Sequence, residues 1–271
     1  MQNPTITLIV STYNQPDFLR LVLDGILDQH DQEFELILAD DGSGHETKSC
    51  IESFCDTSTI QTQHIWQEDM GFRKSAILNK AIAKSSSDYL VFLDGDCIPR
   101  RNFISNHRKL ARKNRIVGCS RILLDQTISQ HLLDNDLKIQ RWSMFEFLKI
   151  RISGHINRIF PLLPLMLGPL RGTTPRAWKR VRGCNFGMYR DDLLAIEGFD
   201  ESFTGWGYED SELVVRAINQ GCFVRRGDHT STVLHLWHPE VSRDEAVSNK
   251  SNLMASLDSG RKTAISSSIT K

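Results

Sequence analysis

The sequence predicts an α/β fold with a mostly parallel, Rossmann-like central sheet flanked by helices. Four apolar segments typical of buried strands, at 5–10, 35–39, 65–66 and 88–93, alternate with helical patterns before residue 95. Strands that alternate with helices pair in parallel through right-handed crossovers. Three of the four segments also run into polar residues at their carboxyl ends, where open α/β sheets bind ligands. A pocket at that edge is therefore expected, although such residues also favour ordinary turns.

Each element of the first half follows from a local pattern. The β-branched run TITLIV (5–10) is a strand, and Pro16 opens a helix with apolar residues at 18, 19, 22, 23, 26 and 27. ELILA (35–39) is a second strand, followed by a helix through Ile51 and Phe54. A short strand near 65–66 leads into a helix at Lys74–Lys84, and DYLVFL (88–93) is a buried strand.

The second half contains fewer but clear elements. A helix is expected near 101–113 and a strand near 116–118. A helix begins at Asp210 and ends before Gly221, a residue type common just past helix ends. VLHLWHP (233–239) is interpreted as a last strand, and the Ser-, Asn- and Lys-rich residues after about 244 as a largely disordered or loosely docked tail.

Asp94-Gly95-Asp96 directly follows the strand at 88–93. Gly95 allows a sharp bend that lets the two carboxylates converge on one point. Paired carboxylates at this edge suit a hard divalent cation that keeps positions open for phosphate oxygens. A second triplet, Asp134-Asn135-Asp136, lies in an amphipathic polar stretch without a preceding strand, so it is interpreted as solvated surface.

Composition excludes several classes of protein. Lys+Arg and Asp+Glu are both 33 in 271 residues, and this neutral balance argues against a general nucleic-acid binder. The six cysteines form no CxxC pair, which indicates reduced thiols in the cytoplasm and argues against zinc. The sequence has no signal-peptide pattern and no apolar run long enough to span a bilayer.

Residues 149–182 differ in character from the rest of the chain. They contain eight Lys or Arg and no Asp or Glu, around the apolar, proline-rich run 159–170. Such a segment suits contact with an anionic lipid surface or a phosphorylated acceptor. An ordinary buried loop with basic flanks fits the sequence equally well.

Glu209-Asp210 begins a helix, where negative charge is favoured. Helix capping alone would explain the pair, but Gly205-Trp206-Gly207-Tyr208 precedes it. Aromatic faces pack on sugar rings, and a neighbouring carboxylate can take a proton from a hydroxyl nucleophile. His235 and His238 would point to opposite faces of a continuous strand, so only one is expected to join the Asp pair unless the strand ends early.

These motifs together resemble an inverting family 2 glycosyltransferase with a GT-A fold. The second half is similar to the C-terminal galactosyltransferase-type region of chondroitin-polymerase-like and β-1,4-galactosyltransferase-like enzymes. The resemblance covers residues 5–240 except the divergent segment 120–180. The motifs in chain order are STYN, DDGS, GFRKSAILNKA, FLDGD, RGCNFGMYR, GWGYEDSE and LHLWH.

The resemblance implies a role for each matching residue. Asp210 would be the catalytic base, with Glu209 as the next candidate. The metal, Mn²⁺ or Mg²⁺, would be held by Asp94, Asp96 and His235, and a histidine ligand favours Mn²⁺. The acceptor would contact Trp206, Asn185 and Glu209. The nucleotide-sugar donor would contact Ser11, Tyr13, Asp41, Arg73, Asp94, Gly95 and Asp96.

The implied activity is metal-dependent transfer of a hexose, with inversion, from a nucleotide sugar, expected to be UDP-linked, to a glycan or lipid-linked saccharide. Bacterial surface polysaccharide or lipopolysaccharide synthesis would use such a step, in the cytoplasm or on the inner face of the membrane. Expected divisions are a nucleotide-sugar half (1–118), a divergent insert (119–182), an acceptor and catalytic half (183–240) and a polar tail (241–271). A sugar-nucleotide nucleotidyltransferase and a non-catalytic sugar-binding protein are the alternatives.

Overall fold

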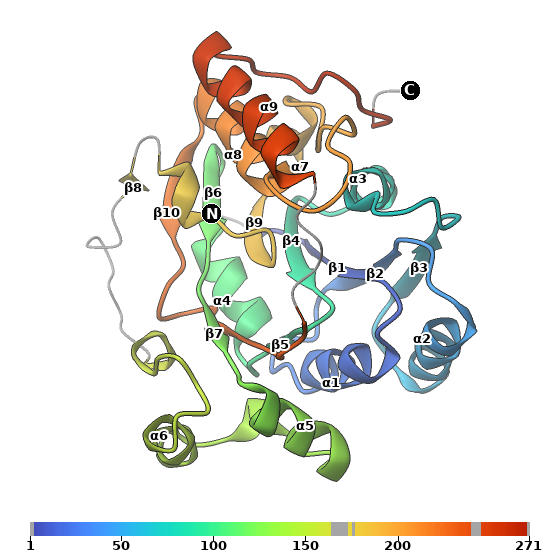
Figure 1. Ribbon diagram of the computed structural model, residues 1–271, viewed down its shortest axis with the longest axis vertical. Helices are drawn as coiled ribbons and strands as arrows, with labels where there is room; N and C mark the ends of the chain where they lie inside the picture. The colour runs from blue at the N-terminus through green and yellow to red at the C-terminus, as the bar shows by residue number, and fades with distance from the viewer. Residues whose placement is uncertain (1–2, 164–172, 175–176, 240–244, 270–271) are drawn as a thin grey trace.

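An eight-stranded sheet forms the centre of the protein, in the order β3-β2-β1-β4-β9-β6-β10-β8 (Figure 1). The computed structural model describes residues 3–163, 173–174, 177–239 and 245–269. The strands of this sheet are β1 (Ile6–Thr12), β2 (Glu35–Asp40), β3 (Thr62–Trp66), β4 (Tyr89–Asp94), β6 (Arg115–Gly118), β8 (Thr173–Thr174), β9 (Asn185–Tyr189) and β10 (Phe223–Arg226). A second sheet of three short strands has the order β5-β11-β7, with β5 (Cys97–Pro99), β7 (Arg121–Leu123) and β11 (Val233–His235).

The predicted α/β fold with a mostly parallel sheet is confirmed. Strands β1 to β4 pair in parallel, as do β6 and β10. Strand β9, which enters between β4 and β6, runs antiparallel to both. Its first residue, Asn185, pairs with Leu93 near the carboxyl end of β4, so the residues just before β9 reach the ligand-binding edge.

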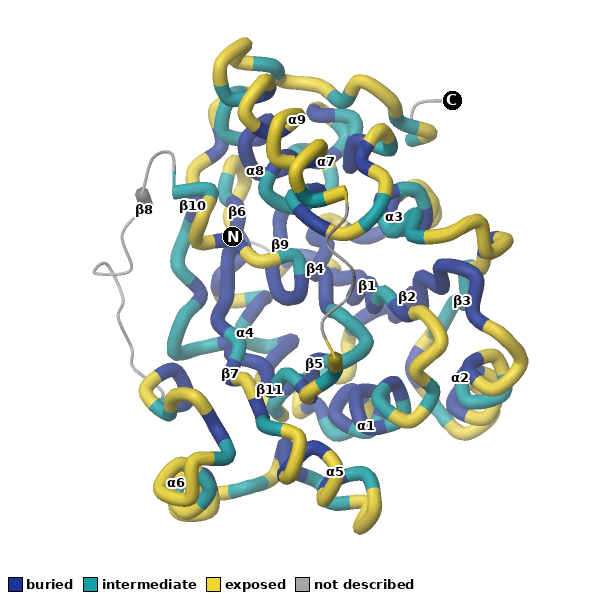
Figure 2. The backbone as a smooth tube through the Cα atoms, in the orientation of Figure 1, coloured by how far each residue is buried: buried dark blue, intermediate teal, exposed yellow. Residues whose placement is uncertain are grey.

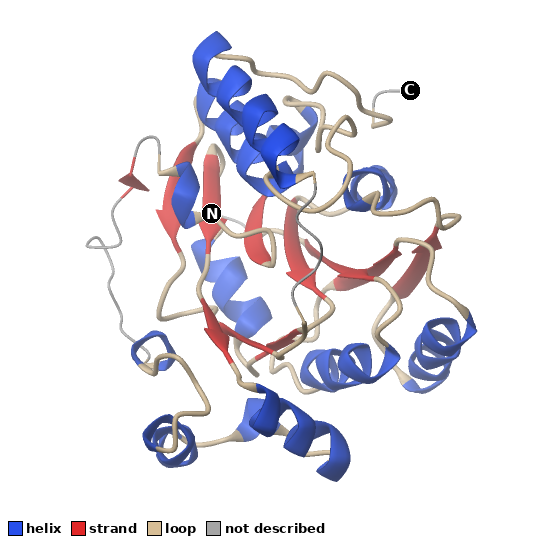
Figure 3. Ribbon diagram, in the orientation of Figure 1, coloured by secondary structure: helices blue, strands red, loops and turns tan. Residues whose placement is uncertain are grey.

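Helices cover both faces of the sheet (Figure 3). The helices are α1 (Pro16–Leu27), α2 (His45–Thr57), α3 (Lys74–Lys84), α4 (Phe103–Leu110), α5 (Gln126–Asn135), α6 (Met144–Ile152), α7 (Arg190–Leu194), α8 (Glu209–Asn219) and α9 (Ala246–Ser259). Short 3₁₀ turns are η1 (Ile139–Arg141), η2 (Phe160–Leu162) and η4 (Trp178–Arg180). Side chains of β1 alternate between two cores, with Leu8 and Val10 facing α1, α2 and α4 and Ile9 facing α3, α7 and α8. Burial on both faces explains why β1, β2 and β4 are nearly continuous apolar runs (Figure 2).

The predicted strand at 233–239 is shorter than expected. Strand β11 ends at His235 because its partner β5 begins only at Cys97, and the next residue, Leu236, donates its N–H to the carbonyl of Asp96. Residues 236–239 therefore do not continue the strand.

The prediction of a disordered or loosely docked tail is wrong for the described residues 245–269. They include α9, which packs on α8 through the buried Leu253 (Figure 1). Arg261 then donates to the buried Glu212 at 2.7 Å, and Glu212 also pairs with the buried Arg216 at 2.8 Å. Ionic hydrogen bonds thus fasten a segment that offers little apolar area.

The insert is only partly described, because residues 164–172 and 175–176 lie outside the described part, and with them most of the apolar run 159–170. Helix α6 begins with a capping box between Ser143 and Glu146 and buries Phe147. Its other face is exposed, with Phe145 64%, Leu148 45% and Ile152 78% accessible. Asp136, by contrast, pairs with Arg20 and Lys138 on the surface, as expected for a solvated triplet.

Candidate active site

The carboxyl ends of β1, β2 and β3 meet at one edge and bring together the predicted nucleotide-binding residues. Asp41 is buried, and its carboxylate accepts hydrogen bonds from the backbone N–H of Arg73 at 2.8 Å and from Gln67 at 2.5 Å. Burial raises the pKa of Asp41 despite these bonds. The ring of Tyr13 is 48% exposed and its hydroxyl donates to Asp69 at 2.9 Å. An exposed aromatic face beside a fixed carboxylate suits a planar base.

Asp94, at the end of β4, is held by two donors. The hydroxyl of Ser11 lies 2.9 Å and the ammonium of Lys74 2.5 Å from the same oxygen, Oδ1. Burial lowers the pKa of Lys74, but the charges of Asp94 and Glu209 outweigh this and raise it above its ordinary value. Sequence reasoning missed Lys74. Its position directly after Arg73, in the GFRKSAILNKA motif, is a usable signal.

Gly95 is required by a close backbone approach. Its N–H donates to the carbonyl of Ser11 at 2.8 Å, and a Cβ at this position would lie 2.8 Å from that same carbonyl oxygen. The absence of a side chain therefore lets the turn between Asp94 and Asp96 press against β1.

Gly95→Ala is expected to lower the free energy of unfolding by about 1–3 kcal/mol, because the added methyl cannot fit without shifting β1 or the turn. Chemical denaturation monitored by circular dichroism measures this. Gly154→Ala is a control for the added methyl group, because no atom would lie within 4 Å of the new Cβ. Its φ of +85° disfavours a side chain, so a small loss of stability is expected in this control as well. Unchanged stability of Gly95→Ala would show that the turn is not tightly packed.

Asp96 lies between two histidines. Its Oδ2 is 3.6 Å from Nε2 of His235 and 3.1 Å from Nε2 of His238. Burial opposes ionisation of Asp96, but the hydrogen bond from His238 and the charge of His235 outweigh it, so the pKa falls to about 2. Because β11 ends at His235, both rings face the same carboxylate, contrary to the expectation for a continuous strand.

The donor set fits a divalent cation. Asp96, His235 and the buried Cys97 each place one ligand atom within 4.8 Å of the other two. Burial lowers the pKa of His235, which favours the neutral ring that a metal needs. A carboxylate with imidazole suits Mn²⁺ better than Mg²⁺. Sequence reasoning did not include Cys97, whose thiol also donates a hydrogen bond to Asp96 at 3.2 Å.

Glu209 and Asp210 form the first turn of α8, after a Tyr208 in the left-handed conformation. Asp210 is half-buried and accepts from the N–H of Gly183 at 2.5 Å and from that of Ser211 at 2.6 Å. Glu209 is buried, and burial together with the charge of Asp210 raises its pKa to about 7. Asp210 is thus the more accessible of the two carboxylates and is fixed in one orientation.

One short segment connects the Asp94–Asp96 turn to the first turn of α8. Gly183 donates to Asp210, and the next residue, Cys184, accepts from the N–H of Asp94 at 3.3 Å. Trp206 is 41% exposed in the turn before α8. The predicted acceptor contact of Asn185 does not fit the structure, because this side chain is fully buried and donates to the carbonyls of Ser120 and Ser231. Asn185 instead ties the start of β9 to two neighbouring loops.

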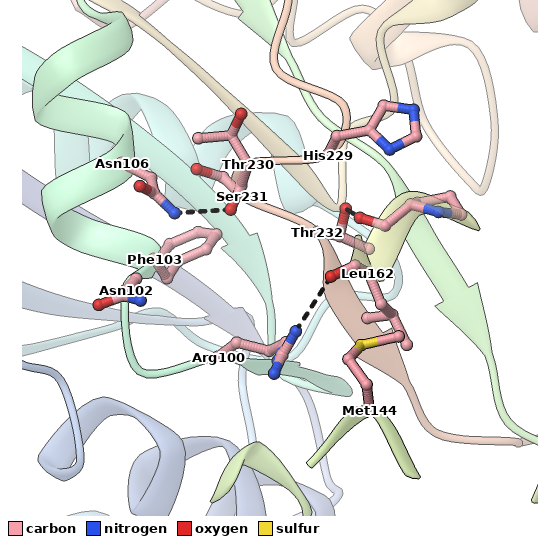
Figure 4. A pocket seen from close by; sticks show the side chains of 11 residues that line it. Arg100, Asn102, Phe103, Asn106, Met144, Leu162, His229, Thr230, Ser231 and Thr232 are labelled. Atoms are coloured by element: carbon pink, nitrogen blue, oxygen red, sulfur yellow. Dashed lines mark hydrogen bonds between the residues drawn. The ribbon is translucent and has the colours of Figure 1, made fainter. Parts of the chain in front are cut away.

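A small hollow of about 180 Å³ lies away from these carboxylates, between α4 and the loop before β11. Figure 4 shows that its lining is held by bonds from Asn106 to the Thr230 carbonyl and from Arg100 to the Leu162 carbonyl. The bond from Arg100 attaches the insert, and the bond from Asn106 on α4 attaches the loop before β11. The hollow contains none of the residues predicted for catalysis.

Comparison with known proteins now decides the family. The family model described as Glycosyl transferase family 2 matches residues 7–159, which is more than half of the chain. The chain belongs to glycosyl transferase family 2. A second model, described as N-terminal domain of galactosyltransferase, matches residues 173–239 of this glycosyltransferase and so covers Asp210 and His235.

The similar proteins include chondroitin synthase of Escherichia coli, 24% identical over 81% of this glycosyltransferase and 33% of the relative. Validoxylamine A glucosyltransferase of Streptomyces hygroscopicus subsp. jinggangensis is 23% identical over 80% of this chain and 52% of the relative. The chain therefore spans about a third to a half of the length of these relatives.

Solved structures share the fold of this glycosyltransferase. The mannosyltransferase PcManGT of Pyrobaculum calidifontis, in complex with GDP-Man and Mn²⁺, has a TM-score of 0.60 at 16% identity, covering 94% of this chain and 63% of that one. GalNAc-T7 with UDP, GalNAc and Mn²⁺ has a TM-score of 0.62 at 14% identity, covering 94% and 48%. The predicted GT-A fold is thereby confirmed.

Proposed function

We propose that this protein is a metal-dependent, inverting glycosyltransferase that moves a hexose from a UDP-sugar to a hydroxyl of a glycan or lipid-linked saccharide. The observation that carries the proposal is the direct connection, through Gly183 and Cys184, between Asp210 and the Asp94–Asp96 turn. The donor site and the acceptor site would thus lie on either side of the backbone segment Gly183-Cys184. Two structural neighbours were solved with Mn²⁺, which supports a divalent ion, and one of them was solved with UDP, which supports the donor.

A metal bound by Asp96 and His235, with His238 or Asp94 nearby, would stabilise the negative charge that develops on the departing diphosphate. Asp94 and Ser11 would position the ribose, and Tyr13 would stack on the base. Lys74 holds Asp94 in place and reduces the repulsion between Asp94 and Glu209.

On the acceptor side, Asp210 would take the proton of the attacking hydroxyl as that oxygen bonds to the anomeric carbon. The bond from this carbon to the diphosphate breaks on the opposite face, which inverts the configuration. Asp210 is suited to this role because it is half-exposed, whereas Glu209 is buried. Trp206 would pack on the acceptor sugar.

Product analysis tests this proposal. The protein is incubated with Mn²⁺, a panel of UDP-sugars and candidate acceptors, and UDP release and product anomers are measured. A UDP-sugar should raise the melting temperature, since binding to the folded state stabilises it. Release of pyrophosphate from UTP and a sugar 1-phosphate in a parallel reaction, without release of UDP from any UDP-sugar, would instead identify a nucleotidyltransferase, and binding without turnover a non-catalytic protein.

We also propose peripheral contact between α6 and an anionic membrane. None of the helices in the described part of the chain is long and apolar enough to cross a bilayer. The exposed Phe145, Leu148 and Ile152 recur at helical spacing on one face of α6, and the exposed Lys149 and Arg151 flank them. An apolar stripe beside basic residues suits shallow insertion between anionic headgroups.

The double variant Phe145→Ser/Ile152→Ser is expected to lower partition into phosphatidylglycerol vesicles roughly tenfold, because two apolar side chains that would insert into the membrane are lost. Flotation measures the bound fraction. Val247→Ser/Met254→Ser, on the exposed face of α9, is the matched control. Equal flotation of all three proteins, or flotation insensitive to salt, would contradict contact through α6.

A further inference from the structure

A second cleft opens beside the active site, with a volume of about 540 Å³. Six basic residues contribute to its lining, and one acidic residue, Asp228, does so. The basic residues are Arg121, Arg158, Lys179, Arg180, Arg182 and Arg226. We refer to this site as the basic cleft.

The charge of the basic cleft is a local feature. The whole chain carries equal numbers of basic and acidic residues, so an excess of six to one is not a consequence of composition. Asp228 already pairs with Arg226 at 3.2 Å. Among the residues that the structure describes, none of the other five basic side chains forms an ion pair with a carboxylate. Their charges are thus available to an anionic ligand.

The basic cleft and the catalytic residues share structural elements. Leu123, in the wall of the cleft, is the strand partner of His235. Arg121 reaches to 3.7 Å from the thiol of Cys184, the residue that contacts the Asp94 turn. Arg182 immediately precedes Gly183, which holds Asp210. A ligand in the cleft would therefore lie next to the reaction centre.

The position of the cleft assigns it to the acceptor side. The predicted nucleotide-binding residues follow β1, β2 and β3, whereas the cleft involves residues from β7 and β10, on the other side of β4 (Figure 1). The donor diphosphate is expected at Asp96 and His235, between these two regions. A charged group held by the cleft thus belongs to the molecule that receives the sugar.

We propose that the basic cleft binds a carboxylate or phosphate carried by the acceptor saccharide, so that this enzyme prefers anionic acceptors. This inference rests on the proposed glycosyl transfer. Guanidinium groups bind both anions through paired, charge-assisted hydrogen bonds, and four of the five cations without a carboxylate partner in the described part of the chain are arginines. The cleft also gives four basic residues of the segment 149–182 a specific target, namely Arg158, Lys179, Arg180 and Arg182.

Binding of small probes tests the inference on the full chain in the presence of UDP and Mn²⁺. Glucuronic acid, glucose 1-phosphate and glucose present the same type of ring with a carboxylate, a phosphate or no charge. Calorimetric titration should show binding of the two anionic sugars, weakened by salt, and at least tenfold weaker binding of glucose. Inorganic phosphate should compete with both anionic probes.

Two cleft variants, Arg180→Gln and Arg158→Gln, should each weaken binding of glucose 1-phosphate about tenfold, because each removes a charged donor. The exposed Arg180 is the safer choice, since Arg158 also donates to the carbonyl of Arg121 at 2.8 Å. Lys80→Gln and Lys109→Gln remove the same charge from exposed positions outside the cleft and should leave binding unchanged.

Equal binding of glucose and its anionic analogues, or equal weakening in the cleft and control variants, would overturn the inference. Calorimetry with UDP and Mn²⁺ on the same samples separates the two proposals. Normal UDP binding without preference for anionic sugars would rule out only the proposal that the acceptor is anionic. If the protein bound anionic sugars but did not bind UDP, the proposed glycosyl transfer would be ruled out, and the assignment of the cleft to the acceptor would be ruled out as well.

Discussion

Asp210→Asn is expected to lower the rate of sugar transfer by roughly 10²- to 10⁴-fold, the usual contribution of a general base. The amide keeps the shape of the side chain but cannot accept the proton of the acceptor hydroxyl. The bond from Gly183 can be retained, because the amide oxygen can still accept from its N–H. Affinity for UDP with Mn²⁺ should stay within a few-fold, since the lost interaction acts mainly in the transition state. A UDP-release assay and calorimetry measure the two effects.

Glu209 provides the sharpest alternative to Asp210. Glu209→Gln should cost less activity, because this carboxylate is buried and accepts from the N–H of Gly207. Its pKa of about 7 gives a second criterion, since a base with this pKa would produce an acidic limb near pH 7 in the profile of kcat/KM. In Asp210→Asn the charge that helps to raise this pKa is lost, so near-normal transfer with the acidic limb moved to lower pH would assign the base to Glu209. Asp191→Asn, on the exposed surface of α7, controls for the loss of one carboxylate.

The sequence predicted the first half of the fold well because each element there is specified locally. The helix expected at Lys74–Lys84 is α3, with the same bounds, and the strand at 88–93 matches β4 to within one residue. Both faces of β1, β2 and β4 are buried, so these strands are nearly continuous apolar runs that are easy to recognise. The carboxylates that follow them then reach a common edge by topology alone.

The sequence failed where long-range polar contacts decide the structure. The apolar pattern of α9 is weak, and its position depends on bonds between Arg261 and Glu212, which are 49 residues apart. The alternation rule separated His235 from His238, but the early end of β11 brings both to Asp96. Asn185 matched a motif yet serves a buried hydrogen-bond network, which only the packing of β9 reveals.

The basic residues of 149–182 illustrate a different limit. Their number is visible in the sequence, and an anionic lipid or a phosphorylated acceptor both fit that composition. The structure divides them, because Lys149 and Arg151 lie on α6 whereas Arg158, Lys179, Arg180 and Arg182 line the basic cleft. The two alternatives can therefore hold at once, through separate surfaces.

Removal of divalent metal is expected to abolish transfer. EDTA should eliminate activity, and Mn²⁺ should restore it better than Mg²⁺, because a histidine ligand favours Mn²⁺. The carboxylate of Asp96, with a pKa of about 2, is ionised at any working pH and supplies the negative charge of the cluster. Asp96→Asn removes that charge, so affinity for UDP with Mn²⁺ should fall by roughly 10²-fold or more. Unlike Asp210→Asn, this variant should lose donor binding and turnover together.

The same measurement of UDP binding in the presence of Mn²⁺ distinguishes the roles of His235 and His238. His235→Gln should weaken binding of UDP with Mn²⁺ to nearly the same extent as Asp96→Asn, because Nε2 of His235 faces Asp96 and burial favours its neutral form. In the described part of the chain, His238 is not in the group of ligand atoms that Asp96, Cys97 and His235 form, so His238→Gln should cost less. His45→Gln, on the exposed start of α2, is the control. A larger loss in His238→Gln would transfer the ligand role to His238, and full activity in chelator would exclude a metal from the reaction.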